Sequence, residues 1–187
     1  MEKDGISGMM IMQPTIYSER KRPFATSPVA VQPVIVNNQG QLLLLSSPHR
    51  NKPNQWQFVS GALDAEETVV EAALREASEE VGDAVRLRPL GVIHAQTFHY
   101  DANVRYFIGI YFLMAYEGGE IVPGDDMVDS RYHWWAAEEL EQGEAIGELA
   151  FHPSTNIPWL FARAVELYHL WKDQDTVKLQ PDLSSEQ

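Results

Sequence analysis

Apolar runs separated by polar turns divide the chain into predicted β-strands. Val29–Val36 is rich in β-branched residues and ends at the turn-forming run 37–40, and the apolar run Leu42–Leu45 follows. Two apolar runs around a short polar turn predict a β-hairpin. Three later runs also predict strands, and they are Leu87–His94, Val104–Ala115 and Arg131–Trp135.

Helical spacing of apolar residues appears in three other segments. The segment Glu67–Val81 has this spacing, and Gly82 follows where a helix C-cap glycine belongs. A short acidic helix is predicted over Ala137–Glu141, and a last helix over Pro158–Trp171. One face of the last helix is predicted to pack in the core through Leu160, Ala164, Leu167, Tyr168 and Trp171.

Strands interleaved with helices predict a layered α/β or α+β domain. This domain is expected over residues 28–173, between an N-terminal arm at 1–27 and a polar C-terminal tail at 174–187. The arm contains the basic run 20–22. It is interpreted either as a solvated tail or as a strand or contact made with a second subunit.

Composition narrows the classes of partner. With 14 Lys and Arg against 27 Asp and Glu, the chain of 187 residues carries a net charge of −13. This charge argues against binding of a nucleic-acid polymer or an anionic membrane by bulk electrostatics, although bound cations can reverse the local sign at a phosphate site. The apolar run Tyr106–Tyr116 is too short to span a bilayer, so a soluble protein is expected. The sequence has no cysteine, which excludes a disulfide framework and a thiol nucleophile and agrees with a cytoplasmic location.

Most of the candidate catalytic and metal-binding residues lie in the segment 67–82. At 100° per residue, Glu80 lies about 40° and Glu79 about 300° from Glu76, so the three carboxylates share one edge of the helix. Arg75 lies one turn before Glu79, where it can pair with a carboxylate. The neighbouring face is predicted to be the core stripe, formed by Val70, Ala73, Leu74, Ala77 and Val81.

Three crowded carboxylates have two interpretations. Like charges three and four residues apart repel one another, and a divalent cation such as Mg²⁺ or Mn²⁺ would offset that repulsion through hard oxygen ligands. The alternative is a solvated acidic helix face, which is common in a protein of this charge. The helix by itself leaves both open.

The complete spacing from Gly61 to Asp83 resembles the signature of the Nudix hydrolases, the MutT-like family. The matching positions are Gly61, Glu67, Arg75, Glu76, Glu79, Glu80 and Gly82. The likeness extends over about 29–140, from the predicted hairpin to the run Trp134–Leu140. The sequence departs from the family at Val59–Ser60, where Pro-Gly is usual, and at Asp83, where an apolar residue is usual.

The resemblance implies a Nudix-type α/β/α sandwich, with a mixed β-sheet between helices, and a metal-dependent pyrophosphatase. Such enzymes hydrolyse a nucleoside diphosphate linked to another moiety. The substrate could be a nucleoside triphosphate, a dinucleoside polyphosphate or a nucleotide sugar. The alternative is a nucleotide-binding sensor module of the same fold that does not hydrolyse its ligand. Ser60 favours this alternative, and the complete set of acidic residues argues against it.

The resemblance also assigns roles to residues of the motif. Glu76, Glu79 and Glu80 match the metal ligands for Mg²⁺ or Mn²⁺, and Arg75 matches the arginine that orients a glutamate. Glu79 is the first candidate for the general base. The rival acids lie in the loop Glu117–Asp129, and they are Glu120, Asp125 and Asp126. Structural roles in the motif are implied for Glu67 and Gly82.

Substrate contacts are expected from a few further residues. Gly61 would let the loop backbone approach the substrate closely. Tyr100 resembles the base-stacking tyrosine of dinucleoside polyphosphate hydrolases in this family, or it is an ordinary hairpin aromatic. Two interpretations are open for Arg50, Lys52 and Arg105. These residues either contact the phosphates of the substrate or are solvated surface residues. A small-molecule nucleotide is therefore the expected partner, and a homodimer is an arrangement that the family and the N-terminal arm allow.

Overall fold

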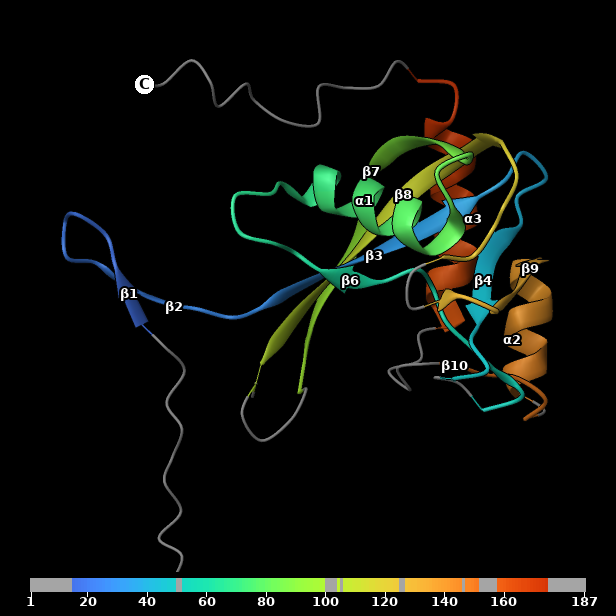
Figure 1. Ribbon diagram of the computed structural model, residues 1–187, viewed down its shortest axis with the longest axis horizontal. Helices are drawn as coiled ribbons and strands as arrows, with labels where there is room; N and C mark the ends of the chain where they lie inside the picture. Colours follow the sequence, from blue (N-terminus) through green and yellow to red (C-terminus); the bar gives the residue numbers. More distant parts are fainter. Residues whose placement is uncertain are drawn as a thin grey trace, which may run out of the picture.

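A mixed six-stranded β-sheet forms the centre of the computed structural model (Figure 1). The structure describes residues 15–49, 52–99, 104, 106–124, 127–145, 147–151 and 158–174. Five strands run in the order β7-β8-β3-β4-β9, and the short strand β6 pairs with β3. The strands are β1 (Thr15–Tyr17), β2 (Pro23–Ala25), β3 (Val29–Val36), β4 (Leu42–Ser46), β5 (Gln55–Trp56), β6 (Gly61–Ala62), β7 (Arg86–Phe98), β8 (Phe107–Gly118), β9 (Arg131–Trp135) and β10 (Ala150–Phe151).

In the described part of the chain, three helices cover the two faces of this sheet. They are α1 (Val69–Val81), α2 (Ala137–Ala145) and α3 (Pro158–Trp171). Figure 1 shows α1 on one face and α3 on the other. The predicted sandwich of a mixed sheet between helices is therefore confirmed, and the bounds of α3 agree with the prediction.

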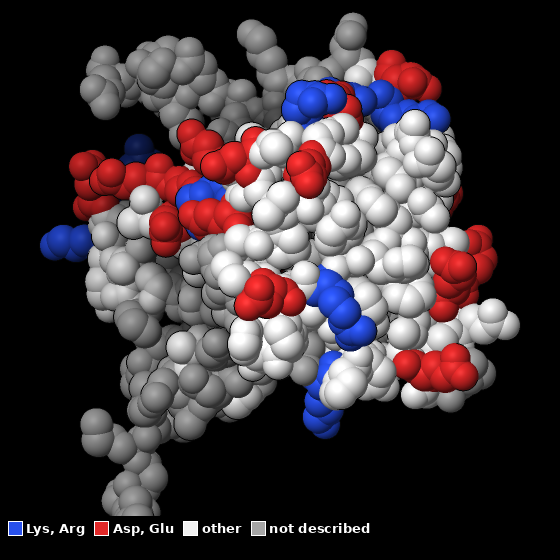
Figure 2. Space-filling model, turned by 45° about the vertical axis from the view of Figure 1, so that its right-hand side comes forward, with Lys and Arg blue, Asp and Glu red and all other residues white. Residues whose placement is uncertain are grey.

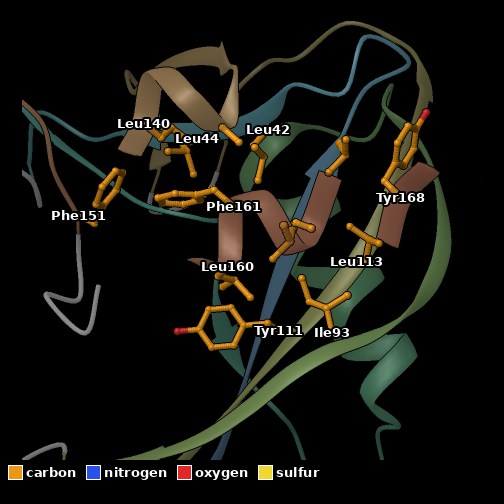
Figure 3. Close-up of a cluster of buried hydrophobic side chains, with 14 of the residues drawn as sticks. Leu42, Leu44, Ile93, Tyr111, Leu113, Leu140, Phe151, Leu160, Phe161 and Tyr168 are labelled. Carbon is orange, nitrogen blue, oxygen red and sulfur yellow. The ribbon is translucent and has the colours of Figure 1, made fainter. Parts of the chain in front are cut away.

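Each face of the sheet carries its own hydrophobic core. The core under α2 and α3 includes the buried rings of Tyr111, Phe161 and Tyr168, which are shown in Figure 3. Among the residues predicted to form the inner face of α3, Leu160, Ala164 and Tyr168 are buried and the others are partly buried. The core under α1 is formed by Val31, Ile35, Leu43, Leu45, Val59, Ala72, Ala73, Ala77, Val81, Phe112, Met114, Ile121 and Met127.

The predicted hairpin of β3 and β4 opens soon after its turn. These strands are antiparallel and in register at Val36 and Leu42. Farther along β3, β6 takes the place beside it, with Ala30 opposite Ala62 and Val31 opposite Gly61. The opening between β3 and β4 thus brings the segment that contains Gly61 into the sheet.

The helix α1 presents a different arc to the sheet from the one predicted. Ala73, Ala77 and Val81 are buried, as predicted. Leu74 is 38% exposed and Ala72 is fully buried, so the predicted burial of Leu74 is wrong. The helix is rotated so that Glu76 and Glu80 of its acidic edge, predicted beside the core face, form part of the buried face, while Glu79 stays exposed.

Part of the N-terminal arm is structured. The strands β1 and β2 form an antiparallel hairpin that lies away from the layered body in Figure 1. Its apolar side chains Ile16, Tyr17 and Phe24 are exposed. The C-terminal tail from 175 lies outside the described residues. In the part of the chain that the structure describes, no helix combines the length and the apolar character that crossing a membrane requires.

Candidate active site

The start of α1 is determined by a capping box. The Thr68 hydroxyl accepts a hydrogen bond from the backbone N–H of Glu71 (3.3 Å), and the Glu71 carboxylate accepts one from the N–H of Thr68 (2.8 Å). The two side chains thereby satisfy two of the N–H groups that have no partner within the helix. The helix consequently begins at Val69, and Glu67 lies in the loop before it.

The Arg75 guanidinium joins the loop, the strand β6 and the helix. It donates to both carboxylate oxygens of Glu67 (2.8 and 2.9 Å) and to the backbone oxygen of Ala62 (2.9 Å). It also donates to Glu76 Oε1 (2.8 Å) and Glu79 Oε2 (3.0 Å). Because the guanidinium is planar and its donors have fixed directions, these contacts determine how the three segments lie around it.

The electrostatic environment differs between the carboxylates. The hydrogen bond from Arg75 holds the pKa of Glu67 below its ordinary value. Burial raises the pKa of Glu76, and this effect exceeds the opposing hydrogen bond from Arg75. The neighbouring carboxylates raise the pKa of Arg75, so the guanidinium stays protonated. The negative charge of Glu76 is therefore disfavoured by its surroundings.

Two carboxylates of α1 are buried against the loop that precedes the helix. Glu76 is 8% exposed, and a Cβ added at Gly61 would overlap its carboxylate. Glu80 is 2% exposed, and its Oε2 accepts a hydrogen bond from the backbone N–H of Ser60 (3.4 Å). The absence of a side chain at Gly61 thus leaves the space that Glu76 occupies.

The loop after β8 is tied to the C-terminal end of α1. The backbone N–H of Val122 donates to the oxygen of Val81 (2.9 Å), and that of Gly124 donates to the oxygen of Glu80 (3.3 Å). A Cβ at Gly124 would lie 2.8 Å from the backbone oxygen of Glu79. The loop that carries the rival candidates for the general base is thus held against the turn that carries the site carboxylates.

The rival acids in this loop have different positions. Glu120 is exposed, and Glu117 pairs with Arg88 (2.7 Å). Asp125 and Asp126 lie outside the described residues, so their role stays a prediction. Glu79 faces solvent, with a side chain that is 42% exposed.

The structure brings most of the predicted motif residues together. Arg75 contacts Glu67, Glu76 and Glu79, while Gly61 and Glu80 lie at the same loop. Gly82 ends α1 with a φ of 100°, and its N–H donates to the Ser78 oxygen (2.9 Å). Lys52 is exposed. The remaining predicted substrate contacts lie outside the described residues, and they are Arg50, Tyr100 and Arg105.

Several participants could not be identified from side-chain patterns. The Ser60 N–H and the Ala62 carbonyl contribute through the backbone, which any residue possesses. Asp64 lies 3.9 Å from Arg75 and adds to the negative charge around it. The Thr68 cap, by contrast, could be identified from the sequence, because Thr followed three residues later by Glu is a capping-box pattern.

The carboxylate oxygens on the acidic edge of α1 are ligands that suit a hard divalent cation. Figure 2 shows a cluster of acidic side chains with basic atoms among them at the upper left, and separate acidic groups elsewhere on the same face. Within the described residues, no three Asp, Glu, His or Cys side chains form a ready metal-binding group. Mg²⁺ usually takes one or two carboxylates together with substrate phosphates and water, so it does not need such a group. Glu76 and Glu80, both buried at the same loop, supply two carboxylates.

Comparison with known proteins identifies one family. A family model described as the NUDIX domain matches residues 26–160. No curated protein sequence matches the chain.

Solved structures share the fold at low sequence identity. A NUDIX hydrolase from Nitrosomonas europaea is 19% identical, with a TM-score of 0.56, over 78% of this chain and 90% of that one. An ADP-ribose pyrophosphatase from Streptococcus suis is 17% identical, with a TM-score of 0.52, over 75% and 91% of the two chains. The dihydroneopterin triphosphate pyrophosphohydrolase of E. coli is 22% identical, with a TM-score of 0.50, over 76% and 94%.

Replacement of the central arginine tests its structural role. We expect Arg75→Gln to lower the free energy of unfolding by about 1–3 kcal/mol, because Glu76 would stay buried without its cationic partner. The matched control is Arg86→Gln, which removes one exposed hydrogen bond to the Glu117 backbone. Urea denaturation at neutral pH measures both. Equal effects of the two substitutions would contradict the role of Arg75 as the organising group.

A methyl group at Gly61 tests the packing of the loop on Glu76. We expect Gly61→Ala to reduce the free energy of unfolding by about 1–3 kcal/mol, because the new Cβ must displace the Glu76 carboxylate. Ser60→Ala, at the next residue, keeps the backbone N–H that contacts Glu80 and adds no atom. Thermal denaturation of the two variants should therefore differ, and a Gly61→Ala protein as stable as Ser60→Ala would refute the close approach.

Proposed function

This chain belongs to the NUDIX family of hydrolases, which act on pyrophosphate bonds, and we propose that it is a Mg²⁺- or Mn²⁺-dependent pyrophosphohydrolase of nucleotides. The substrate is a nucleoside diphosphate linked to another moiety. The observation that carries this proposal is the burial of Glu76 and Glu80 beside a loop whose residue 61 has no side chain.

Glu76, Glu79 and Glu80 are the groups that would hold the divalent cation. Burial disfavours the ionised form of Glu76, so the approach of a positive charge removes an unfavourable interaction. When bound, the cation would neutralise pyrophosphate oxygens and make a water molecule more acidic. The carboxylates thereby allow a protein of net charge −13 to bind a polyanionic substrate.

The remaining motif residues position these carboxylates and the water. Arg75 holds Glu76 and Glu79 through a single guanidinium nitrogen. Glu79 is the proposed general base, because its carboxylate lies at the solvent-facing side of the helix and can accept a proton from water. Gly61 gives the loop backbone close access to the substrate, and Glu67 and Gly82 keep the loop and the helix end in place.

The substrate class follows from the chemistry of the site and from the family. Proteins with a similar fold include one named for ADP-ribose and one named for dihydroneopterin triphosphate. We propose nucleoside triphosphates, dinucleoside polyphosphates and nucleotide sugars as the classes to test. Tyr100 keeps its proposed role as a substrate contact and lies outside the described residues.

A substitution of one buried carboxylate tests the proposed reaction. We expect Glu80→Gln to lower kcat by at least about a hundredfold in the presence of Mg²⁺ or Mn²⁺, because it removes a negative ligand and preserves the side-chain shape. Phosphate release is measured with nucleoside triphosphates, dinucleoside polyphosphates, nucleotide sugars, ADP-ribose, NADH and coenzyme A. Glu138→Gln, on the exposed side of α2, is the control.

The outcomes separate the enzyme from a sensor. Cleavage of one compound by the wild type and the control, but not by Glu80→Gln, identifies the substrate and supports the mechanism. If the wild type binds nucleotides and releases no phosphate with either metal ion, the proposed hydrolysis is wrong.

The N-terminal hairpin is the proposed contact with a second copy of the chain. Ile16, Tyr17 and Phe24 are 58%, 69% and 44% exposed, and an isolated two-stranded hairpin is marginally stable in water. The turn between its strands contains the basic run 20–22, whereas the whole chain carries a charge of −13. An acidic surface of an identical chain would therefore complement this hairpin in charge.

A cytoplasmic location is also proposed, and cell fractionation would test it.

Removal of the apolar residues tests this contact. We expect the wild type to have twice the chain mass of 21.2 kDa in light scattering, and the double variant Ile16→Ser, Tyr17→Ser to have the mass of one chain. Leu170→Ser changes an equally exposed apolar residue on α3 and should leave the mass unchanged. A monomeric wild type across the micromolar range would exclude the dimer.

A further inference from the structure

A cavity with aromatic walls lies at the edge strand β9. Its volume is about 540 Å³, and its walls include the rings of Trp56, Tyr132, His133 and Trp135 and the side chain of Arg131. In Figure 1, β9 lies at the side of the sheet next to α2. Trp56 of β5, from a distant part of the sequence, contacts Trp135 of β9. Arg131, His133 and Trp135 alternate along β9 and so share one face of the strand, and they build this wall with Tyr132 and with a tryptophan from elsewhere in the chain.

The rings hold one another in place. Trp56 and Trp135 meet edge to face, with centroids 5.2 Å apart and an interplanar angle of 79°. His133 and Trp135 are 4.5 Å apart at 67°. Such tilted contacts are favourable for aromatic pairs, so the wall is a preformed surface for another planar ring.

Arg131 adds a positive charge to this surface. Its guanidinium carbon lies 5.5 Å from the centre of the Trp56 ring. One of its nitrogens donates to the Pro53 oxygen (2.9 Å) and to the Ser46 hydroxyl (3.4 Å). No carboxylate forms an ion pair with Arg131 in the part of the chain that the structure describes. Neutral groups thus orient the Arg131 guanidinium, and its positive charge is available to a ligand.

Trp135 has an unused hydrogen-bond donor. Its Nε1 is the one buried side-chain nitrogen or oxygen without a partner among the described residues. A buried donor without an acceptor is unfavourable, and a ligand that carries an acceptor atom would remove this cost. The cavity therefore combines aromatic rings and a cation with a lining residue, Trp135, whose donor has no partner.

Two segments of the chain connect residues of the cavity to the carboxylate site. Trp56 lies four residues before Ser60, whose N–H contacts Glu80, and four residues of chain span at most about 14 Å. On the other side, Pro123 lines the cavity and precedes Gly124, whose N–H donates to the Glu80 backbone. A molecule with phosphates at the carboxylates and a ring a few bonds away could reach the cavity.

We propose that this cavity binds the nucleobase of the hydrolysed nucleotide. A nucleobase is a planar heteroaromatic ring with hydrogen-bond acceptors, which matches the rings and the cation of the cavity and the unpartnered donor of Trp135. The proposal rests on the proposed function, since it assumes that the nucleotide is the substrate. A second nucleotide, bound apart from the reaction, would have the same chemistry, and the kinetic experiment below separates the two.

Binding without a divalent cation tests the cavity independently of hydrolysis. Titrations of AMP and GMP, with ribose 5-phosphate as the ligand that lacks a base, are followed by calorimetry in EDTA. We expect Arg131→Met and Trp135→Phe each to weaken nucleotide binding by roughly fivefold or more, because each removes one recognition group. Neither should change the binding of ribose 5-phosphate. Arg88→Met, on the strand at the opposite edge of the sheet, is the control.

Thermal denaturation checks the fold of each variant. Trp135→Phe keeps an aromatic ring, so it decides the question if Arg131→Met fails to fold. Nucleotide binding of wild-type strength in the folded variants would overturn the proposal.

Kinetics identify which nucleotide occupies the cavity. With a cleaved substrate, Arg131→Met should raise KM more than it lowers kcat. Weaker binding of AMP and GMP with an unchanged KM would show that the cavity binds a separate nucleotide, and the assignment to the substrate would be wrong. If the wild type hydrolyses nothing, the proposed function fails, while the metal-free titrations still decide whether the cavity binds a base.

Discussion

The position of the candidate site depends on one charge-assisted network around Arg75. Its guanidinium contacts a loop carboxylate at Glu67, a strand carbonyl at Ala62 and two helix carboxylates at Glu76 and Glu79. Bidentate and charged hydrogen bonds of this kind define direction as well as distance. The arginine therefore holds the loop, β6 and α1 together, and a lysine, with a single ammonium, could not join them in the same way.

Burial of negative charge is the feature that links this network to chemistry. Glu76 and Glu80 are 8% and 2% exposed in a protein of net charge −13. A buried carboxylate is unfavourable unless it is paired, and perturbed groups of this kind cluster at functional sites. Arg75 compensates Glu76 only in part, since burial still raises the pKa of this carboxylate. The fold thus retains a local excess of negative charge, which a divalent cation can relieve.

Most of the fold could be predicted because local patterns are strong. The bounds of Val29–Val36, Arg131–Trp135 and Pro158–Trp171 agree with the structure, since β-branched runs, turn residues and an N-terminal proline mark their ends. The strand predicted at Leu87–His94 is longer, as β7 pairs with β8 as far as Phe98 opposite Phe107. Pairing with a neighbour, which no local pattern contains, extends it.

The sequence by itself determined the spacing of the carboxylates and the residues that accompany them. Helical geometry establishes the angles between Glu76, Glu79 and Glu80, and the match to the family pattern supplies Arg75 and Gly61. Only the tertiary structure decided which arc of α1 faces the sheet, so that Leu74 is exposed. The angle between two residues of a helix is a local property, whereas the helix's rotation depends on the space left by Gly61 and on the loop that binds its C-terminal end. The aromatic cavity has the same origin, because its walls come from distant segments that meet only in the folded sheet.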